Sequence, residues 1–331
     1  METFRALVVN KEGNDFSVEV KSLSFDDLPE GEVTIKTAYS SVNYKDGLAC
    51  IPNGKIVSTY PFVPGIDLAG TVVASTDPRF KEGDEVIATS YEIGVTHYGG
   101  FSEYARVKAD WVVPLPKGLT LKEAMAYGTA GFTAALSIQK LEEHGLRPEN
   151  GEVVVTGATG GVGSLAVAML AKLGYYVVAS TGKTSEHDYL KKLGAKKVVS
   201  REEVKPEVIR PLGKQLWAGA VDPVGGQTLA ALLSNMKYGS SVAVSGLTGG
   251  PKVETTVFPF ILRGVNLLGI DSVYCPMEIR KPLWERMATE LKPESLLSDI
   301  GQEVDLDGLP NVLERILRGE IRGRTIVTFE K

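Results

Sequence analysis

A glycine-rich stretch near the middle of the chain decides the fold of its surroundings, and it runs Val153-Val-Val-Thr-Gly157-Ala158-Thr159-Gly160-Gly161-Val162-Gly163. The pattern predicts an apolar strand, a tight turn and then an apolar helix from Ser164 to Leu173. Glycines let a backbone approach a pyrophosphate, and the N–H groups that open the helix stabilise its charge. Because Ala158 replaces the first glycine of a strict G-x-G-x-x-G motif, the motif alone is weak, and a purely structural turn is the alternative.

The residues around this turn strengthen the dinucleotide-binding interpretation. Short apolar runs recur roughly every 22 residues with helical patterns between them, which is the alternation of a βαβ series. These runs centre near Val154, Val177, Val198, Val221, Val242 and Leu268. Six such strands predict a doubly wound parallel sheet of the Rossmann type, connected by right-handed crossovers.

The first third of the chain has a different rhythm, with short β-rich runs separated by turn signals. This pattern favours a small, partly open β-barrel over a parallel sheet. The predicted strands are Phe4–Val9, Val18–Leu23, Val33–Val42, Leu68–Ser75, Val86–Thr89, Tyr104–Val107 and Trp111–Val113. We expect an α/β protein with a barrel domain over residues 1–122, a cofactor domain over 123–296, and a C-terminal segment over 297–331 whose strand-like Thr325–Phe329 returns to the barrel.

The composition excludes several classes of protein. The 331 residues include 36 Lys and Arg against 41 Asp and Glu, a net charge of -5, and no basic block suited to nucleic acid. Cys50 and Cys275 stand far apart and cannot build a disulfide framework or a four-thiolate zinc site, which favours a reducing compartment, the cytoplasm. We also expect no signal peptide and no membrane segment, because no apolar run has the required pattern.

The end of the second strand of the βαβ series predicts the cofactor. Sites that prefer NAD usually carry Asp or Glu there to bind the ribose 2′-hydroxyl. Here the strand Tyr176–Ala179 is followed by Ser180-Thr181-Gly182-Lys183, and Arg201 follows the third strand. Hydroxyls and cations suit a 2′-phosphate through charge-assisted hydrogen bonds, so we predict NADPH. Taken singly, Lys183 and Arg201 are equally compatible with solvated surface charges.

The chain resembles the medium-chain dehydrogenase/reductase superfamily over essentially its whole length. The barrel, the loop of residues 157–163 and Gly128-Thr-Ala-Gly-Phe-Thr-Ala134 all occur in the order typical of that superfamily. The resemblance implies a GroES-like, partly open β-barrel catalytic domain into which a Rossmann NADP-binding domain is inserted.

The resemblance also implies that no metal is bound. The Gly-His-Glu signature of zinc alcohol dehydrogenases here reads Gly65-Ile66-Asp67, and the segment of the catalytic-zinc Cys reads Asn43-Tyr44-Lys45-Asp46. A catalytic zinc needs three protein ligands, and the remaining candidates show no ligand spacing. Those candidates are His97, His144, His187, Cys50 and Cys275. His97 lies in a barrel loop that could reach the active cleft, although a structural role is the simpler interpretation.

Within the superfamily the chain is most similar to the acryloyl-CoA reductase group, also known as YhdH-type quinone oxidoreductases. The segments that carry this similarity are Ser40–Ala49, Pro64–Gly70, Gly269–Val273 and Ile321–Val327. The resemblance implies hydride transfer from NADPH to the β-carbon of an activated alkene, such as a short 2-enoyl-CoA, and protonation of the α-carbon. Tyr44 is the predicted proton donor or enolate hydrogen-bond donor, positioned by Asn43 and Asp46. A packed barrel aromatic at Tyr44 and a turn cap at Asp46 are the alternatives.

The same resemblance and the phosphate loop predict the cofactor contacts. These are Thr129, Thr159, Gly160, Gly161, Val162, Ser180, Thr181, Lys183, Arg201, Gly246, Leu247, Ile270 and Arg324. Arg324 could instead bind a CoA phosphate or lie at the surface. A quinone reductase and a non-catalytic NADPH-binding sensor remain as alternative functions. We expect a small-molecule substrate and a homodimer, with neither nucleic acid nor membrane as a partner.

Overall fold

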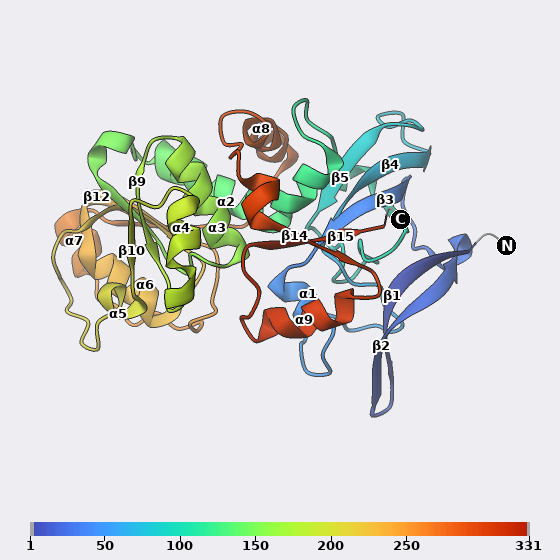
Figure 1. Cartoon of the computed structure of the whole chain (residues 1–331), viewed down its shortest axis with the longest axis horizontal. Helices are drawn as coiled ribbons and strands as arrows, with labels where there is room; N and C mark the ends of the chain where they lie inside the picture. Colours follow the sequence, from blue (N-terminus) through green and yellow to red (C-terminus); the bar gives the residue numbers. More distant parts are fainter. Residues whose placement is uncertain (1–2, 330–331) are drawn as a thin grey trace. The chain divides into compact units, whose positions relative to one another are not determined.

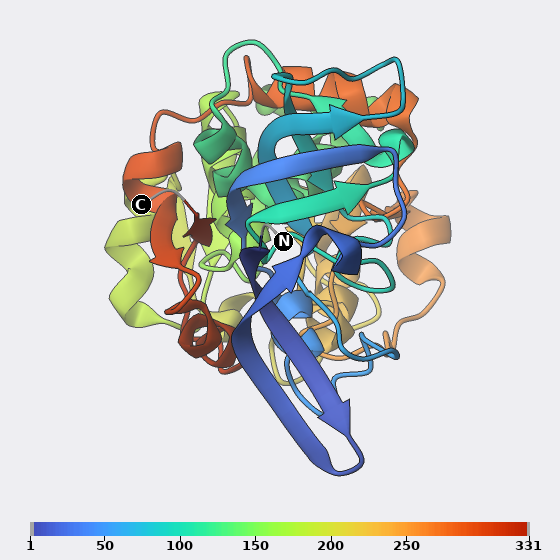
Figure 2. The same cartoon turned by 90° about the vertical axis from the view of Figure 1, so that its right-hand side faces the viewer.

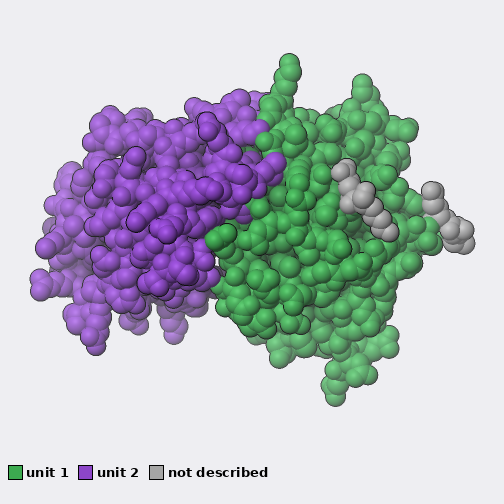
Figure 3. Space-filling model, viewed as in Figure 1, with its two compact units in different colours: residues 1–129, 273–281, 301–331 green, residues 130–272, 282–300 purple. Residues whose placement is uncertain are grey.

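The computed structural model describes residues 3–329 and divides into two compact units (Figure 3). Unit 1 consists of Met1–Thr129, Val273–Lys281 and Gly301–Lys331, and unit 2 consists of Ala130–Ser272 and Pro282–Ile300. These units are defined by their internal contacts and not by independent folding. The domain limits expected from the sequence, 1–122, 123–296 and 297–331, therefore stay a prediction.

Unit 2 is built on the six-stranded parallel sheet that the sequence predicts. Its strands lie in the order β10-β9-β8-β11-β12-β13, and every neighbouring pair is parallel. They are β8 (Glu152–Val155), β9 (Tyr176–Ser180), β10 (Lys197–Val199), β11 (Trp217–Asp222), β12 (Met236–Val244) and β13 (Asn266–Gly269). This order reverses direction between β8 and β11, which is where sheets of this type bind dinucleotides. The predicted fold class is therefore confirmed for this unit.

Helices cover the sheet of unit 2 because the strands are apolar on both faces. Helix α3 packs against β8, β9 and β11, and α6 packs against β11 and β12 (Figure 1). The helices of this part of the chain are the C-terminal part of α2 (Leu121–Glu143), α3 (Gly161–Lys172), α4 (His187–Lys192), α5 (Arg201–Val204), α6 (Gly226–Asn235), α7 (Phe258–Arg263) and the end of α8 (Met277–Met287), with short turns at η3 (Pro148–Asn150), η4 (Thr184–Glu186) and η5 (Leu296–Ile300).

Unit 1 contains a seven-stranded, mainly antiparallel sheet. Its order is β14-β15-β3-β4-β5-β7, and β6 also pairs with β3. The strands are β3 (Val33–Ser41), β4 (Asp67–Ser75), β5 (Glu85–Thr89), β6 (Tyr104–Val107), β7 (Val112–Pro114), β14 (Gly301–Asp305) and β15 (Arg324–Thr328). A separate hairpin of β1 (Thr3–Glu12) and β2 (Asp15–Ser24) extends away from this sheet (Figure 2). The predicted strand at residues 325–329 is present as β15, which pairs with β3.

Two short helices of unit 1 have no counterpart in the sequence analysis. Helix α1 (Tyr44–Ala49) packs against α9 (Leu309–Leu317), and short turns occur at η1 (Phe25–Asp27) and η2 (Ala109–Trp111). A Cβ at Gly47 would lie 3.0 Å from the carbonyl oxygen of Leu313, so a residue without a side chain allows the close contact. Among residues 3–329, no helix is both long and apolar enough to span a bilayer.

Candidate functional site

The glycine-rich loop of unit 2 connects β8 to α3 as predicted. Gly157 has φ 53°, and a Cβ at Gly163 would lie 2.3 Å from the carbonyl oxygen of Gly157, so both positions require glycine. Gly160 caps α3, and Gly161 and Val162 form its first turn. The first N–H groups of this twelve-residue helix are therefore available at the loop, which suits a pyrophosphate.

The predicted 2′-phosphate residues lie next to this loop, at the ends of β9 and β10. The N–H of Ala158 donates to the carbonyl of Ser180 at 3.1 Å, which ties the loop to the end of β9. A Cβ at Gly182 would lie 2.7 Å from Nε and 2.8 Å from Cζ of Arg201, so the exposed guanidinium lies directly over Gly182. The N–H of Lys183 donates to Oγ1 of Thr181 at 3.0 Å. Thr181 and Lys183 thus follow the end of β9, and Arg201, which follows β10, lies against the turn between them.

The remaining predicted cofactor residues of unit 2 are Ser180, at the end of β9, and residues in the loops that follow β12 and β13. The Ser180 hydroxyl is buried and donates to the carbonyl of Ser200 at 3.4 Å, which leaves only its lone pairs for a ligand. Gly246 approaches the carbonyl of Pro223 so closely that a Cβ would lie 2.1 Å away, while Leu247 is exposed. The N–H of Ile270 is used by the sheet, since it donates to Val244.

In unit 1 the predicted catalytic segment is the start of α1. Asn43 precedes the helix, and its N–H donates to Oδ2 of Asp46 at 2.7 Å. The other carboxylate oxygen of Asp46 accepts the N–H of Ile66 at 2.9 Å. Tyr44 is the first helical residue, and its side chain is 47% exposed. Asp46 therefore caps α1, which was one of the two expected roles, and Tyr44 is an exposed phenol rather than a packed aromatic.

Burial has a strong effect on Asp46. Its side chain is fully buried, and burial together with the negative charge of Asp67 raises the pKa of Asp46 to about 7, although hydrogen bonds from Asn43 and Ile66 act in the opposite direction. The carboxyl group is therefore half protonated near neutral pH.

Asp67 and Arg324 form a buried polar network with the predicted residues of unit 1. Asp67 accepts the Ser41 hydroxyl and the Asn43 amide N–H, each at 2.7 Å on Oδ2. It also accepts the backbone N–H of Thr129 at 3.0 Å and the Thr129 hydroxyl at 2.5 Å. The Thr129 hydroxyl oxygen lies 2.9 Å from that of Ser90.

Arg324 is 2% exposed and uses most of its N–H groups inside unit 1. Nη1 donates to the carbonyl of Val42 at 2.8 Å and to Oδ1 of Asn43 at 3.2 Å, and Nη2 donates to the Ser41 hydroxyl at 2.9 Å. Nη2 also lies 3.7 Å from Oδ2 of Asp67. Among the described residues Nε has no acceptor, so it is the atom left for the predicted phosphate contact, which stays a prediction. The expected surface alternative for Arg324 is wrong, because the side chain is buried.

Helix α2 is interrupted where it meets this network. Gly128 has φ 53° and ψ -157°, and a Cβ there would lie 2.4 Å from both Oδ2 of Asp67 and Oγ of Ser41. The helix begins at Leu121, and Gly128 is the break after which Thr129 presents its N–H to Asp67.

The structure groups the predicted residues in two sets, each within one unit. Thr159, the residues at the start of α3, Thr181, Lys183 and Arg201 lie along one edge of the sheet of unit 2. Asn43, Tyr44, Asp46, Thr129 and Arg324 gather in unit 1. Sequence reasoning missed Ser41 and Asp67 as members of the second set. Their signal was available, because both belong to segments that carry the family resemblance.

No metal centre is indicated by the side chains. Among residues 3–329, no group of three or more His, Cys, Asp or Glu side chains is arranged to hold a metal ion. Ile66, at the position of the metal-binding His, is buried. His97 has a structural role, since its Nε2 lies 2.7 Å from the carbonyl of Arg106 and its ring packs edge-on against Trp111. The side chains present do not fit a catalytic zinc.

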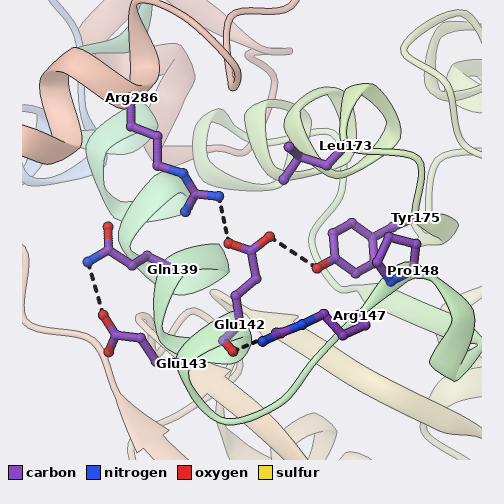
Figure 4. A pocket seen from close by; sticks show the side chains of 8 residues that line it. All are labelled: Gln139, Glu142, Glu143, Arg147, Pro148, Leu173, Tyr175 and Arg286. Carbon is purple, nitrogen blue, oxygen red and sulfur yellow. Dashed lines mark hydrogen bonds and ion pairs between the residues drawn. The ribbon is translucent and has the colours of Figure 1, made fainter.

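A pocket of about 460 Å³ in unit 2 lies apart from all predicted site residues (Figure 4). Glu142 is at its centre, where it accepts Nη2 of Arg286 at 2.6 Å and the Tyr175 hydroxyl at 3.1 Å. Arg147 donates to the backbone carbonyl of Glu142 at 2.8 Å. Glu142 and Arg286 form an ion pair and Arg147 is bound to backbone carbonyls, so the polar groups of this pocket serve to hold the surrounding segments together.

Two protein families and several known proteins match the chain. The family described as "Alcohol dehydrogenase GroES-like domain" matches residues 29–117, and that described as "Zinc-binding dehydrogenase" matches residues 161–289. The chain is 62% identical over 324 residues to YhfP of Bacillus subtilis, whose name assigns it to the quinone oxidoreductases, and the match covers 98% of each chain. It is 53% identical over 326 residues to the acrylyl-CoA reductase AcuI of Ruegeria pomeroyi, again over 98% of each chain.

Solved structures agree with these relatives. The crystal structure of YhfP with NAD bound superposes with a TM-score of 0.97 at 61% identity, covering 99% of this chain and 100% of that chain. The YhdH oxidoreductase of Salmonella enterica in complex with NADP superposes with a TM-score of 0.96 at 49% identity, covering 98% and 100%.

The fold and these matches define the class: the chain belongs to the medium-chain dehydrogenase/reductase superfamily, as the resemblance predicted. Within it the chain falls in the group that contains AcuI, YhdH and YhfP, and it is a zinc-independent oxidoreductase.

Proposed function

We propose that this oxidoreductase uses NADPH to reduce the carbon–carbon double bond of a short 2-enoyl-CoA, with acryloyl-CoA as the first candidate. One observation carries the proposal: the exposed phenol of Tyr44 stands on a helix start that buried polar groups hold in place. Such a phenol can donate a proton without help from a metal. The 53% identity to an acrylyl-CoA reductase supports the substrate class.

In this mechanism, bound NADPH supplies a hydride to the β-carbon, because the thioester carbonyl makes that carbon electrophilic. The electron pair of the double bond moves toward the carbonyl, which gives an enolate. Tyr44 then donates its hydroxyl proton to the α-carbon, and water restores the proton to the phenolate. Asn43 and Asp46 hold the backbone from which Tyr44 projects, through the 2.7 Å hydrogen bond between them.

The choice of NADPH rests on residues of unit 2. The second strand ends at Ser180 without an acid, and Thr181, Lys183 and Arg201 follow where a 2′-phosphate would bind. The related YhdH structure contains NADP, whereas the YhfP structure contains NAD, so cofactor preference has to be measured for this chain.

Quinone reduction is the second candidate function. It is favoured by the 62% identity to YhfP, which exceeds the identity to AcuI. Quinones and enoyl thioesters are both conjugated acceptors, and the residues described above can serve either.

The test compares the two substrate classes on the same enzyme. NADPH carrying deuterium at the transferable position is supplied with acryloyl-CoA, crotonyl-CoA, a simple enone or a naphthoquinone. We expect deuterium at the β-carbon of the acyl product and a solvent proton at the α-carbon. Tyr44→Phe should lower kcat by about 10²- to 10⁴-fold, the usual scale for general acid catalysis, while NADPH affinity changes little. Efficient turnover of the quinone with no turnover of either thioester would move the protein to the second function.

A homodimer is also proposed, on the basis of unit 2. Strand β13 is the last strand of its sheet, and exposed apolar side chains lie on it and on the neighbouring helix segment. They are Val257, Phe258, Ile261, Leu262 and Leu267. An apolar surface beside an open sheet edge is a typical protein interface. Light scattering should give twice the chain mass, and Ile261→Asp should shift the protein toward the monomer. A monomeric wild-type protein at micromolar concentration would refute this assembly.

A further inference from the structure

The buried pair of Asp67 and Arg324 has no role in the mechanism above, although it holds two of the residues around Tyr44. Asp67 is 0% exposed and Arg324 is 2% exposed. Both side chains make their described contacts inside unit 1, so removing one charge would leave the other buried without compensation. Burying two charges is energetically costly, and such a pair is useful where it fixes the orientation of neighbouring groups. The contacts of Asp67 and Arg324 show that the group held here is the side chain of Asn43.

The Asp67 carboxylate accepts hydrogen bonds from three neighbouring residues. The donors are the hydroxyls of Ser41 and Thr129, the amide of Asn43 and the backbone N–H of Thr129. Arg324 completes the arrangement because it donates to the amide oxygen of Asn43 at 3.2 Å. The Asn43 amide is thus held on both sides, its nitrogen by an anion and its oxygen by a cation, and this fixes its orientation.

The backbone around Asn43 is held equally firmly. Arg324 donates to the carbonyl of Val42, the N–H of Val42 donates to Thr325, and the N–H of Asn43 donates to Asp46. Tyr44 follows directly, and its hydroxyl has no hydrogen-bond partner among residues 3–329, so the direction of the side chain depends on this backbone.

We propose that Asp67, with Arg324 as its counter-ion, is the positioning residue that fixes Asn43 and thereby sets the direction of the Tyr44 hydroxyl. The inference rests on the proposed role of Tyr44 as proton donor. Asp67 itself touches neither substrate nor proton in this account, and it acts through Asn43.

Asp67→Asn is the informative change. It keeps the size of the side chain, but an NH2 group replaces one carboxylate oxygen. Oδ2 faces Ser41 and Asn43, and Oδ1 faces the hydroxyl and N–H of Thr129. Either amide orientation therefore sets two donors against each other, and the arrangement has to shift. Arg324→Lys keeps the charge and loses the planar fork that reaches three acceptors, so a smaller effect in the same direction is expected.

The first readout is structural and does not depend on chemistry. Hydrogen–deuterium exchange of the peptide spanning residues 41–50 should be faster in Asp67→Asn than in the wild type. Glu142→Gln is the matched control, because it also neutralises a carboxylate that is paired with an arginine, at 2.6 Å, in unit 2. The control should leave exchange of that peptide and kcat unchanged. Unchanged exchange in a folded Asp67→Asn protein would overturn the positioning proposal.

The second readout is a double-mutant cycle on kcat. Asp67→Asn should lower kcat by about 10- to 100-fold in the wild-type background and by less than about threefold in the Tyr44→Phe background, because both changes remove the same contribution. Additive losses, or a loss confined to the KM for NADPH, would overturn the proposal. If Tyr44→Phe itself keeps full activity while exchange at residues 41–50 rises in Asp67→Asn, the proposed role of Tyr44 fails and the holding of Asn43 stands.

A milder variant covers the case in which Asp67→Asn does not fold. Ser41→Ala removes one donor to Asp67 and one acceptor of Arg324. It should give the same non-additivity with Tyr44→Phe and a loss of about three- to tenfold in kcat. A fully active Ser41→Ala protein with unchanged exchange at residues 41–50 would count against the proposal in the same way.

Discussion

Replacing Asp46 with asparagine should remove a pH-dependent penalty on folding. Burial and the charge of Asp67 raise the pKa of Asp46 to about 7, from an ordinary value of 3.8. Between these two values the folded protein holds a proton on Asp46 and the unfolded chain does not. The free energy of unfolding therefore falls as pH rises through this interval, by about 1.4 kcal/mol per pH unit and about 4 kcal/mol in all. Above about pH 8 both states are ionised and the contribution becomes constant.

Asparagine at position 46 does not titrate, so the comparison with the wild type isolates this residue. The charged groups facing it, Asp67 and Arg324, are the same in both proteins. The difference in unfolding free energy, wild type minus Asp46→Asn, should fall by about 2 kcal/mol between pH 5 and pH 7 and level off above about pH 8. A hydrogen bond lost by the amide shifts this difference by the same amount at every pH.

Urea denaturation at a series of pH values measures the effect. Trp111 lies in unit 1, and Trp217 and Trp284 lie in unit 2. A common background with Trp217→Phe and Trp284→Phe leaves Trp111 as the single tryptophan, so its fluorescence follows unit 1. A difference that stays flat or rises from pH 5 to pH 7 would refute the assignment of a raised pKa to Asp46.

Three further outcomes are expected. The wild-type kcat/KM for NADPH should exceed that for NADH by at least about tenfold, and the double variant Lys183→Ala, Arg201→Ala should lose this preference. Equal efficiency with the two cofactors in the wild type would refute the role of Lys183 and Arg201 in binding the 2′-phosphate. Gly128→Ala should destabilise unit 1 by about 2 kcal/mol more than Gly13→Ala. Both glycines have positive φ, but only at Gly128 would a Cβ meet Asp67. Equal losses of unfolding free energy in urea denaturation would contradict this. Elemental analysis should find no stoichiometric zinc and chelators should leave activity intact, whereas about one zinc per chain would overturn metal independence.

The regular elements were predictable because their signal is local. The strands of unit 2 are continuous apolar runs, since both faces of a parallel sheet are covered, and each predicted run corresponds to one of β8 to β13. Helix α1 was missed because six residues are too few to show helical periodicity, and its start depends on the bond between Asn43 and Asp46. The break at Gly128 was missed because it depends on Asp67, which is far away in sequence.

The buried network could not be read from spacing. Arg324 and Ser41 are 283 residues apart, and Asp67 and Thr129 are 62 residues apart. Sequence reasoning identified Arg324, Asn43 and Thr129 as candidates, each for a contact with a ligand. The pairing of β15 with β3 brings Arg324 to Ser41 and Asn43, and the pairing of β3 with β4 brings Asp67 beside them.

The tip of the hairpin of β1 and β2 is a suitable site for inserting a tag or an attachment group. Its tip is exposed from Lys11 to Asp15, and a Cβ at Gly13 would meet nothing within 4 Å. The backbone pairing ends at Glu12 and Asp15, so residues inserted between them interrupt no hydrogen bond of the ladder. Surface loops of this kind tolerate insertions with only a small entropic penalty. A peptide tag, a fluorophore attachment site or a tether to a solid support could therefore be built in at residues 13 and 14 without altering the sheet of unit 1.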